Sequence, residues 1–402
     1  MGMEKGSGLN FGPYDYSGGG GNPQPPTPQG EYFVKVIDYD GTVLDEQWLD
    51  DGAEYTLPAN PDRTDKGLVF QEWSSSETIT NGKITIDKNN VMVGAIYTTA
   101  SGQNEFDIEL NANTGLTVTL NIDGDKDWGD GSAVDNLTTH TYSQTGKYTI
   151  KTDGTTITSS SSSGIFGQKE GSSYINNYCV AVRLATVTNI QSYSFINCCA
   201  IKHISCSKSL QYISSYCFYL CRNLKAFVIP STIDYYGGIG YMNGYCFRAC
   251  SALEYVVIPN TIYQFNSYPY GMFQECYSLK YLAVPKISTG NATQLWQNCI
   301  GLEQIVIAFH TVQNDMFKEC YSLKKVKFTT QVQGTIRTTS FSNCYNVLEY
   351  DFSDVTSIPT LSATDAFKNI NFYCKIKVPA SLYDSWIVAS NWTIYADHIV
   401  AV

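Results

Sequence analysis

The sequence predicts a mainly β protein in which two small β modules precede a repeat solenoid with a short helical C-terminal cap. Three observations support this prediction. A short apolar pattern returns seven times in the second half of the chain, apolar and polar residues alternate over residues 32–97, and the repeat stops before residue 380. Self-similarity at a period of about 20 to 50 residues is typical of solenoids.

Each copy of the repeat has an aromatic residue, a cysteine three positions later, and Leu, Ile or Val three positions after that. The cysteines of consecutive copies are 23, 29, 26, 23, 21 and 24 residues apart. We expect these side chains to stack as two ladders inside the coil, because one turn can bury its apolar face only against its neighbours. The ladder positions are Phe195, Cys198, Phe218, Cys221, Phe247, Cys250, Phe273, Cys276, Trp296, Cys299, Phe317, Cys320, Phe341 and Cys344.

A short strand is predicted after each aromatic and cysteine pair. Phe227 and Ile229, for example, are two residues apart and precede Pro230. Residues two apart point to the same face of a strand, so each copy gives one brief strand with one buried face. Charged residues on alternate places predict that the other face is solvated, and these are Lys225, Glu254, Lys280, Glu303 and Lys324.

At these positions the chain resembles the BspA-like leucine-rich repeat proteins, whose unit reads roughly I-x-x-x-x-F-x-x-C-x-x-L-x-x-V-x-I-P. The resemblance implies a right-handed coil of short parallel strands over residues 171–379. It also implies a surface protein that recognises protein or glycan, and it brings no catalytic residues.

Residues 31–100 form the first predicted module. Alternation around the Asp40-Gly41 turn predicts a small antiparallel sheet. The order V-x-x-x-D-x-D-G-T, L-P-x-N-P, F-x-x-W and A-x-Y resembles the Listeria-Bacteroides (internalin B-repeat) module, which implies a β-grasp-like unit.

Residues 101–158 form the second predicted module. The motifs W-G-D-G from Trp128, H-x-Y from His140 and G-x-Y-x-I from Gly146 resemble the PKD family of immunoglobulin-like sandwiches. That resemblance implies a spacer or contact domain. We expect His140 to pack beside Trp128 rather than to act chemically.

The sequence predicts no metal site and no cofactor. Acidic residues cluster at Asp123, Asp125, Asp127 and Asp130, but a calcium loop needs Gly and an acid where Trp128 and Val134 stand. We expect these aspartates to cap their own turns. The 13 cysteines include no C-x-x-C pair, so we expect small buried side chains and folding under reducing conditions.

Two further segments flank the solenoid. Residues 159–170 begin with five serines and predict a short hinge. Residues 380–402 break the repeat and predict a C-terminal cap, in which a helix over residues 382–389 begins with Ser381 and Asp384 as a capping box.

Composition and motifs exclude several classes of function. The net charge of −11 argues against nucleic acid, because such binding needs Lys and Arg to neutralise phosphates. No apolar stretch reaches the roughly 18 residues that a spanning helix needs, so we expect no membrane insertion. The four histidines stand apart from any hydrolase or phosphate-binding motif, so we expect no enzyme.

The prediction is therefore a non-catalytic recognition or adhesion protein, with a stalk of two modules carrying the repeat head. We expect a bacteriophage virion surface protein, a head or tail fibre or decoration, made in the host cytoplasm, because the chain is thiol-rich and residues 1–30 hold no export signal. This Gly- and Pro-rich segment would be a flexible anchor arm that binds a virion structural protein. A bacterial cell-surface or secreted adhesin is the alternative, and a polysaccharide-degrading enzyme is the minor one.

The expected ligand is a glycan or protein of the host surface, and association of like chains stays open. Tyrosines in the longest repeats are the candidate ligand-binding residues, because sugar rings stack on aromatic rings, with simple packing as the competing interpretation. They are Tyr235, Tyr236, Tyr241, Tyr245, Tyr263, Tyr268 and Tyr270.

Overall fold

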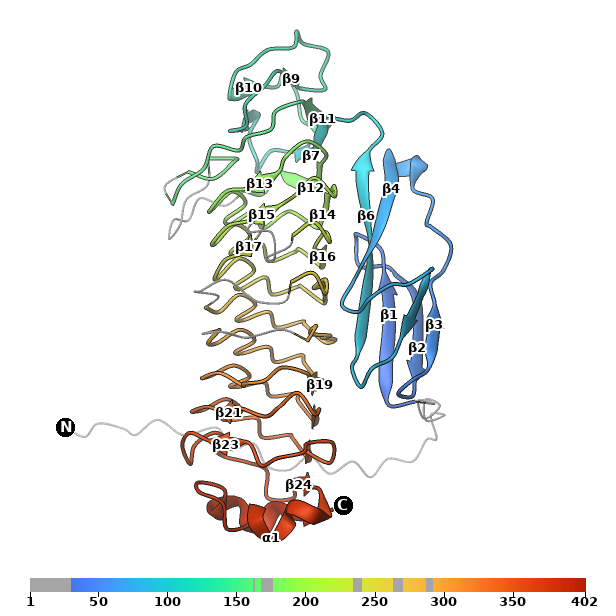
Figure 1. Cartoon of the computed structure of the whole chain (residues 1–402). Coiled ribbons are helices and arrows are strands. Elements are labelled where there is room, and N and C mark those ends of the chain that lie inside the picture. Colours follow the sequence, from blue (N-terminus) through green and yellow to red (C-terminus); the bar gives the residue numbers. More distant parts are fainter. Residues whose placement is uncertain (1–29, 162, 168–175, 234–240, 263–269, 287–291) are drawn as a thin grey trace, which may run out of the picture.

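The computed structural model of the chain describes residues 30–161, 163–167, 176–233, 241–262, 270–286 and 292–402. A tall coil of stacked turns dominates the molecule, with short helices at its C-terminal end (Figure 1). The N-terminal β sheet lies along one side of this coil, next to the column of strands that includes β14, β16 and β19.

The first module is a small mixed sheet with an added strand pair. Its elements are β1 (Tyr32–Ile37), β2 (Val43–Leu49), β3 (Glu54–Thr56), η1 (Thr64–Lys66), β4 (Leu68–Ser75), β5 (Lys83–Thr85) and β6 (Val91–Thr99). The sheet order is β2-β1-β6-β4, and β3 pairs with β5. The predicted antiparallel sheet is wrong in one respect, because β1 and β6 run parallel. In the β1–β2 turn Gly41 has a φ of 87°, a left-handed conformation that suits glycine.

The second module closes the N-terminal end of the coil. Its strands are β7 (Asn104–Leu110), β8 (Thr117–Thr119), β9 (Lys126–Asp127), β10 (Thr139–Thr141) and β11 (Gly146–Thr152). One sheet, in the order β14-β12-β7-β11-β9, runs from this module into the first turns of the solenoid. The apolar core is equally continuous, from Phe106 to Ile399.

The predicted hinge is not found where the structure describes residues 159–170. Ser159 Oγ donates to the Ser192 carbonyl at 2.9 Å, and Ile165 and Phe166 are fully buried in the common core. Serines are common in loops, but here two apolar residues directly after them fix the segment against the first turns.

The solenoid has two columns of short parallel strands. The first column contains β12 (Cys179–Leu184), β14 (His203–Cys206), β16 (Ala226–Val228), β18 (Tyr255–Val257), β19 (Gln304–Ile307), β20 (Lys325–Phe328), β22 (Glu349–Asp351), β24 (Lys375–Val378) and β25 (Ile399–Ala401). The second contains β13 (Asn189–Ile190), β15 (Tyr212–Ile213), β17 (Tyr241–Met242), β21 (Thr335–Ile336) and β23 (Thr360–Leu361). Equivalent residues pair without register shifts, as in Ile305, Val326, Tyr350 and Ile376. The sequence analysis predicted one strand per turn and missed the second column.

The aromatic ladder residues form one stack along the coil axis. From Phe195 to Phe341, consecutive ring centroids are 5.0–6.4 Å apart and the rings are within 2–17° of parallel. An eighth ring, Phe367, continues the stack 5.5 Å from Phe341. Its repeat has Ile370 in place of the cysteine, so the pattern of aromatic residue and cysteine has seven copies.

The ladder thiols also bond neighbouring turns together. Each thiol donates to the main-chain oxygen of the aromatic ladder residue one turn earlier, at 3.0–3.2 Å, and the donors are Cys221, Cys250, Cys276, Cys299, Cys320 and Cys344. A methyl group at this place could not donate. Burial raises the pKa of these thiols, for Cys344 to about 12, so they stay protonated. All 13 cysteines are thiols outside any disulfide, and twelve are buried.

The segment of each turn that carries the aromatic ladder residue, here called the return stroke, bends at left-handed residues two places before and two places after that residue in the seven turns from Phe195 to Phe341. Around Phe247, Tyr245 has a φ of 60° and Ala249 a φ of 58°. This geometry points the amides of Tyr245, Phe247 and Ala249 at carbonyl groups of the next turn, 2.8–2.9 Å away. The return strokes are therefore hydrogen-bonded from turn to turn, although they are not strands.

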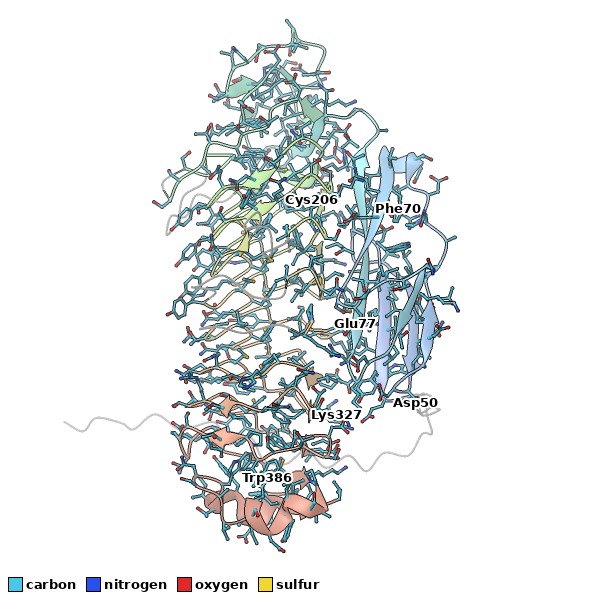
Figure 2. The ribbon with its side chains drawn as sticks, viewed as in Figure 1. Asp50, Phe70, Glu77, Cys206, Lys327 and Trp386 are labelled. Atoms are coloured by element: carbon cyan, nitrogen blue, oxygen red, sulfur yellow. The ribbon has the colours of Figure 1, made fainter. Side chains whose placement is uncertain are left out.

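Aromatic side chains of the C-terminal segment cover the last turns. The segment contains η2 (Ala380–Leu382), α1 (Tyr383–Trp386) and η3 (Thr393–His398). Trp386, labelled in Figure 2, lies 5.3 Å from Phe352, and Tyr395 lies 5.5 Å from Phe367. The predicted helix over residues 382–389 is wrong in extent: α1 has four residues, and no side chain caps it. Over the described ranges, no helix is long and apolar enough to span a bilayer.

Candidate functional site

The first module covers the outer face of the solenoid's first strand column. Phe33 and Ile37 of β1 and Met92 and Ile96 of β6 pack in one apolar cluster with solenoid side chains. The solenoid side contributes Ala226, Val228, Val257 and Ala283, with Tyr255 and Tyr281 half-buried around them. The sheet and the strand column lie side by side over several turns (Figure 1).

Strands β1 and β6 can make this contact because both of their faces are apolar. Val34, Val36 and Val93 fill the module's own core, while Phe33 and Met92 point to the solenoid. A strand buried on both faces shows a nearly continuous apolar run instead of alternation. The runs YFVKVI and VMVGAIY were the sequence signal for this interface, and the sequence analysis interpreted them as alternating.

A glycine permits the closest approach of the two parts. A Cβ at Gly94 in β6 would lie 2.5 Å from Val228 Cγ1 and 3.0 Å from Val257 Cγ2. Real Cβ atoms essentially never show the first distance, and the second is tighter than most real contacts, so a side chain at this place would push the module away.

Polar contacts follow the interface turn by turn. Solenoid amides at Lys208, Ser231 and Asn260 donate to acceptors on β4, at 2.8 to 3.1 Å. In the next turn, the Val284 carbonyl accepts a hydrogen bond from the Asn89 side chain, and Lys286 forms an ion pair with Asp87. Successive turns thus meet successive positions of the module.

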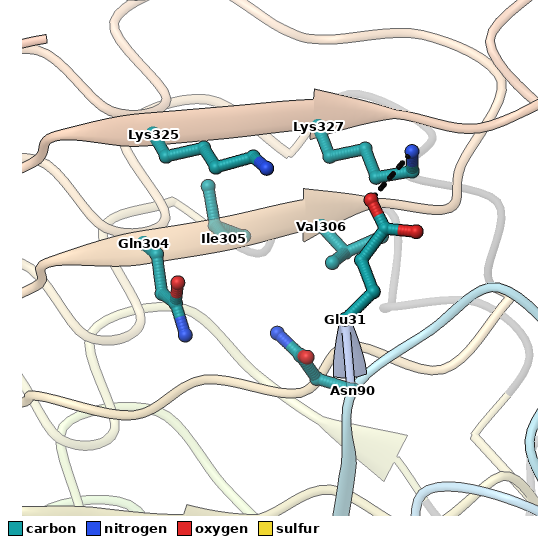
Figure 3. A pocket seen from close by; sticks show the side chains of 7 residues that line it. All are labelled: Glu31, Asn90, Gln304, Ile305, Val306, Lys325 and Lys327. Atoms are coloured by element: carbon teal, nitrogen blue, oxygen red, sulfur yellow. Dashed lines mark ion pairs between the residues drawn. The ribbon is translucent and has the colours of Figure 1, made fainter. Parts of the chain in front are cut away.

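A buried lysine closes the far end of the interface (Figure 3). Lys327 of β20 is 8% exposed and lies 2.9 Å from Glu31, 3.2 Å from Asp354 and 3.6 Å from Asp351. Burial lowers the pKa of Lys327. The bond to Glu31 and the charges of the other two carboxylates raise this pKa by more than burial lowers it, so the net shift is upward. The adjoining cavity, also lined by Asn90, holds about 30 Å³, room for little more than one water molecule.

Two predictions are therefore wrong. The modules do not form a stalk under a repeat head, because the first lies beside the solenoid and the second closes its end. The strand face is not solvated where the first module covers it. The charged residues used for that prediction precede the strands: Lys225, Lys280 and Lys324 are exposed, and Glu254 and Glu303 are half-buried. The outward strand positions hold residues such as Val228 and Val257, which are buried.

The structure describes three of the seven candidate tyrosines. Tyr235, Tyr236, Tyr263 and Tyr268 lie outside the described residues. Tyr241 begins β17, where only its backbone is described. Tyr245 is half-buried and stacks 4.9 Å from Tyr216, which stacks 5.1 Å from Tyr193. Tyr270, also half-buried, accepts the Tyr245 amide at 2.8 Å. Tyr245 therefore belongs to a packed outer row, and its role toward a ligand stays a prediction.

A second aromatic group, not predicted from the sequence, is strongly exposed on the last turns. Tyr321 and Tyr345 directly follow ladder cysteines and stack 5.9 Å apart. Further along, Phe372 is 84% and Tyr373 76% exposed. Exposed apolar groups of this kind often mark contact surfaces.

A cleft of about 600 Å³ lies where the first module, the second module and the first solenoid turns meet. Tyr39 comes from the first module, Asp107 and Tyr148 from the second, and Arg183 and His203 from the first two solenoid turns. Burial lowers the pKa of His203 and raises that of Tyr39. None of these residues was predicted as a site, because they are far apart in sequence and form no motif.

The acidic cluster and His140 have structural contacts. His140 lies parallel to Trp128, 5.0 Å away, and its Nε2 is 2.8 Å from Asp130. Burial raises the pKa of Asp130, but hydrogen bonds from Ser132 and His140 lower it by more, to about 2. Asp123 Oδ1 accepts the amides of residues 155 and 156. Among the described residues, no three His, Cys, Asp or Glu side chains come together as metal ligands would.

The repeat geometry agrees with a family comparison. The family described as "BspA type Leucine rich repeat region" matches in six copies over residues 172–270 and 240–377, more than half of the sequence. The chain belongs to this family. The match does not reach residues 31–158, so the resemblances of the two N-terminal modules remain predictions.

Solved structures of leucine-rich repeat proteins are similar in part. A T. pallidum leucine-rich repeat protein is 19% identical, with a TM-score of 0.33, over 40% of this chain and 72% of its own. One from Bacteroides ovatus is 16% identical, with a TM-score of 0.19, over 56% and 87%. A leucine-rich cell surface protein from Faecalibacterium prausnitzii is 15% identical, with a TM-score of 0.22, over 49% and 72%. No curated protein matches the sequence.

Proposed function

We propose that this leucine-rich repeat protein is a non-catalytic recognition and adhesion protein whose ligand is a glycan or protein of a host surface. The observation that carries the proposal is the rigid repeat scaffold of a BspA-type chain. Solenoids present long surfaces on which separate turns each add a contact. The acidic net charge of −11 favours a ligand other than a polyanion.

Part of the solenoid surface is closed to a ligand because the first module covers the strand face. Where the first module covers that face with an apolar interface, the face is closed to a ligand, so we expect recognition on the loop side of the turns or at the junctions between parts. The candidate tyrosines belong to the two repeats with the longest cysteine spacing, 29 and 26 residues. Long loops are the usual carriers of binding residues on a rigid scaffold.

We further propose that the protein is displayed on a bacteriophage virion and is made in the host cytoplasm. Support comes from the 13 cysteines, which are thiols outside any disulfide. The ladder thiols act as hydrogen-bond donors, a role that requires them to stay reduced while the chain folds. Reducing compartments favour such chains. Of residues 1–30, the proposed contact to a virion structural protein, residues 1–29 lie outside the described residues.

The test uses the full chain. A fluorescent version is applied to host bacteria and to a printed glycan array, and binding to either supports recognition. Absence of binding to both would contradict it. In parallel, an antibody to the chain is imaged on purified particles by electron microscopy. Label on virions supports display there, whereas label only on bacterial cells would favour the bacterial adhesin. Release of shorter chains from host polysaccharide would favour the enzyme instead.

A further inference from the structure

Three parts of the chain that are far apart in the sequence build one cleft. The β1–β2 turn and η1 of the first module form one wall, β7 and β11 of the second module form another, and β12 with β14 form the floor. Its volume of about 600 Å³ falls within the usual range of about 300–1,000 Å³ for ligand sites, which prefer boundaries between structural units.

The floor carries a fixed set of hydrogen-bonding groups. Arg183 donates from Nη1 and Nη2 to the two carboxylate oxygens of Asp107, both at 2.7 Å, and from Nε to Glu105 at 2.9 Å. Thr149 Oγ1 also donates to Asp107 at 2.8 Å. Such a bidentate pair holds its planar groups in one orientation, so donors and acceptors are arranged before any ligand arrives.

Aromatic rings stand on both sides of this floor. Tyr39 meets Tyr97 and His203 edge-on, at centroid distances of 5.6 and 6.3 Å. Across the cleft, the Tyr148 hydroxyl donates to the Gln144 carbonyl at 3.0 Å. Each ring also packs on an aromatic residue that does not line the cleft, Tyr39 on Tyr97 and Tyr148 on Tyr142, the latter at 4.3 Å.

Most charged groups around the cleft are in ion pairs, and Asp40 accepts the Thr42 amide at 2.9 Å. Lys147 lies 2.7 Å from Glu109, Lys66 lies 3.3 Å from Asp65, and Arg183 is held by its two carboxylates. A charged ligand would have to compete with these pairs. A ligand with many hydroxyl groups and apolar ring faces would use the exposed edges of the pairs and the aromatic walls together.

We propose that this cleft binds a neutral oligosaccharide segment, and the inference rests on the proposed recognition function, for which it names a site. The two walls belong to different modules, so the bound sugar would contact both. Binding therefore requires the first module to be docked on the solenoid.

Two variants and two controls test the site. Tyr39→Ala removes one wall, and Gly94→Leu pushes the first module off Val228 without altering any residue of the cleft. Val134→Ala changes an exposed residue of the second module that does not line the cleft, and Val69→Leu changes an exposed position in the same module as Gly94. Circular dichroism and melting curves confirm that each full-length variant is folded.

The probe is a panel of neutral oligosaccharides of glucose, galactose and N-acetylhexosamines, with affinities measured by calorimetry. We expect at least a tenfold loss of affinity for Tyr39→Ala, loss of binding for Gly94→Leu, and unchanged affinity for both controls. Amide exchange on the wild-type chain should slow in β7, β12 and the β1–β2 turn when the sugar binds.

The failures of site and function are distinguishable. Unchanged affinity in both Tyr39→Ala and Gly94→Leu would overturn the cleft and leave glycan recognition standing. Binding to host cells without binding to any neutral sugar would overturn the cleft and leave recognition of another ligand. Binding to neither would overturn both proposals.

Discussion

Truncation of one aromatic side chain should loosen the first module from the solenoid. Phe33 has no exposed surface and meets Trp48 and Tyr281 edge-on, at 5.8 and 5.6 Å. Phe→Ala in a packed interior costs about 3–5 kcal/mol. In the undocked state the ring would lie on the open face of its sheet, so nearly all of this cost falls on docking. At about 1.4 kcal/mol per factor of ten, the equilibrium constant for docking should fall roughly a hundredfold to several-thousandfold.

Three solenoid amides report docking directly. Those of Lys208, Ser231 and Asn260 donate to acceptors on the first module, so their hydrogen exchange follows its opening. In Phe33→Ala their exchange should accelerate by the factors above, while the Leu253 amide, bonded within its own turn, should keep its rate.

The control is Val69→Ala, on the exposed side of the same module, which should leave all these rates unchanged. Rates at the three amides that stay within threefold of wild type in Phe33→Ala would refute the idea that this apolar contact holds the module in place.

Three further predictions concern single sites. Ala249→Gly should stabilise the chain by about 1 kcal/mol, because Ala249 has a φ of 58°, whereas Ala252→Gly in an ordinary conformation should destabilise it; equal denaturant midpoints would contradict this. Cys250→Ala should cost about 1–3 kcal/mol, because it leaves a cavity and removes a donor to the Phe218 carbonyl; an unchanged midpoint would argue against the thiol ladder. Burial lowers the pKa of His203, so the unfolded chain takes up its proton first, near pH 6.5, and stability should fall as pH drops from there through the lower folded value. His203→Gln should flatten melting temperature against pH between 7.5 and 5, and an identical slope would contradict it.

The repeat itself was readable because its physics is local and recurrent. The Phe218-x-x-Cys221-x-x-Leu224 spacing places three side chains inside one turn, and the next turn has the same need. Two features were not predicted because their local sequence pattern is weak. The second strand column has only two residues per turn, as in β15, and the last turn replaces the cysteine with Ile370.

The docking of the first module depends on which apolar residues of the strands face outward. The repeat pattern identifies only the residues that face inward, so it did not predict this contact. Val228 lies between the core positions Phe227 and Ile229 and faces the module. Its partner Gly94 is more than a hundred residues earlier in the chain. The three-part cleft was unpredictable for the same reason, since Tyr39 and Arg183 are brought together only by that docking.

The turn-by-turn contacts also restrict how this protein can evolve in length. A free-standing array of repeats can gain or lose whole units by duplication or deletion, because each unit meets only its neighbours. Here, inserting one unit between the turns of Lys208 and Lys327 would move one end of the array relative to Gln71 and Glu31, which sit on a sheet of fixed size. The fixed length of the sheet limits the number of turns, so we expect sequence variation to concentrate in the loops.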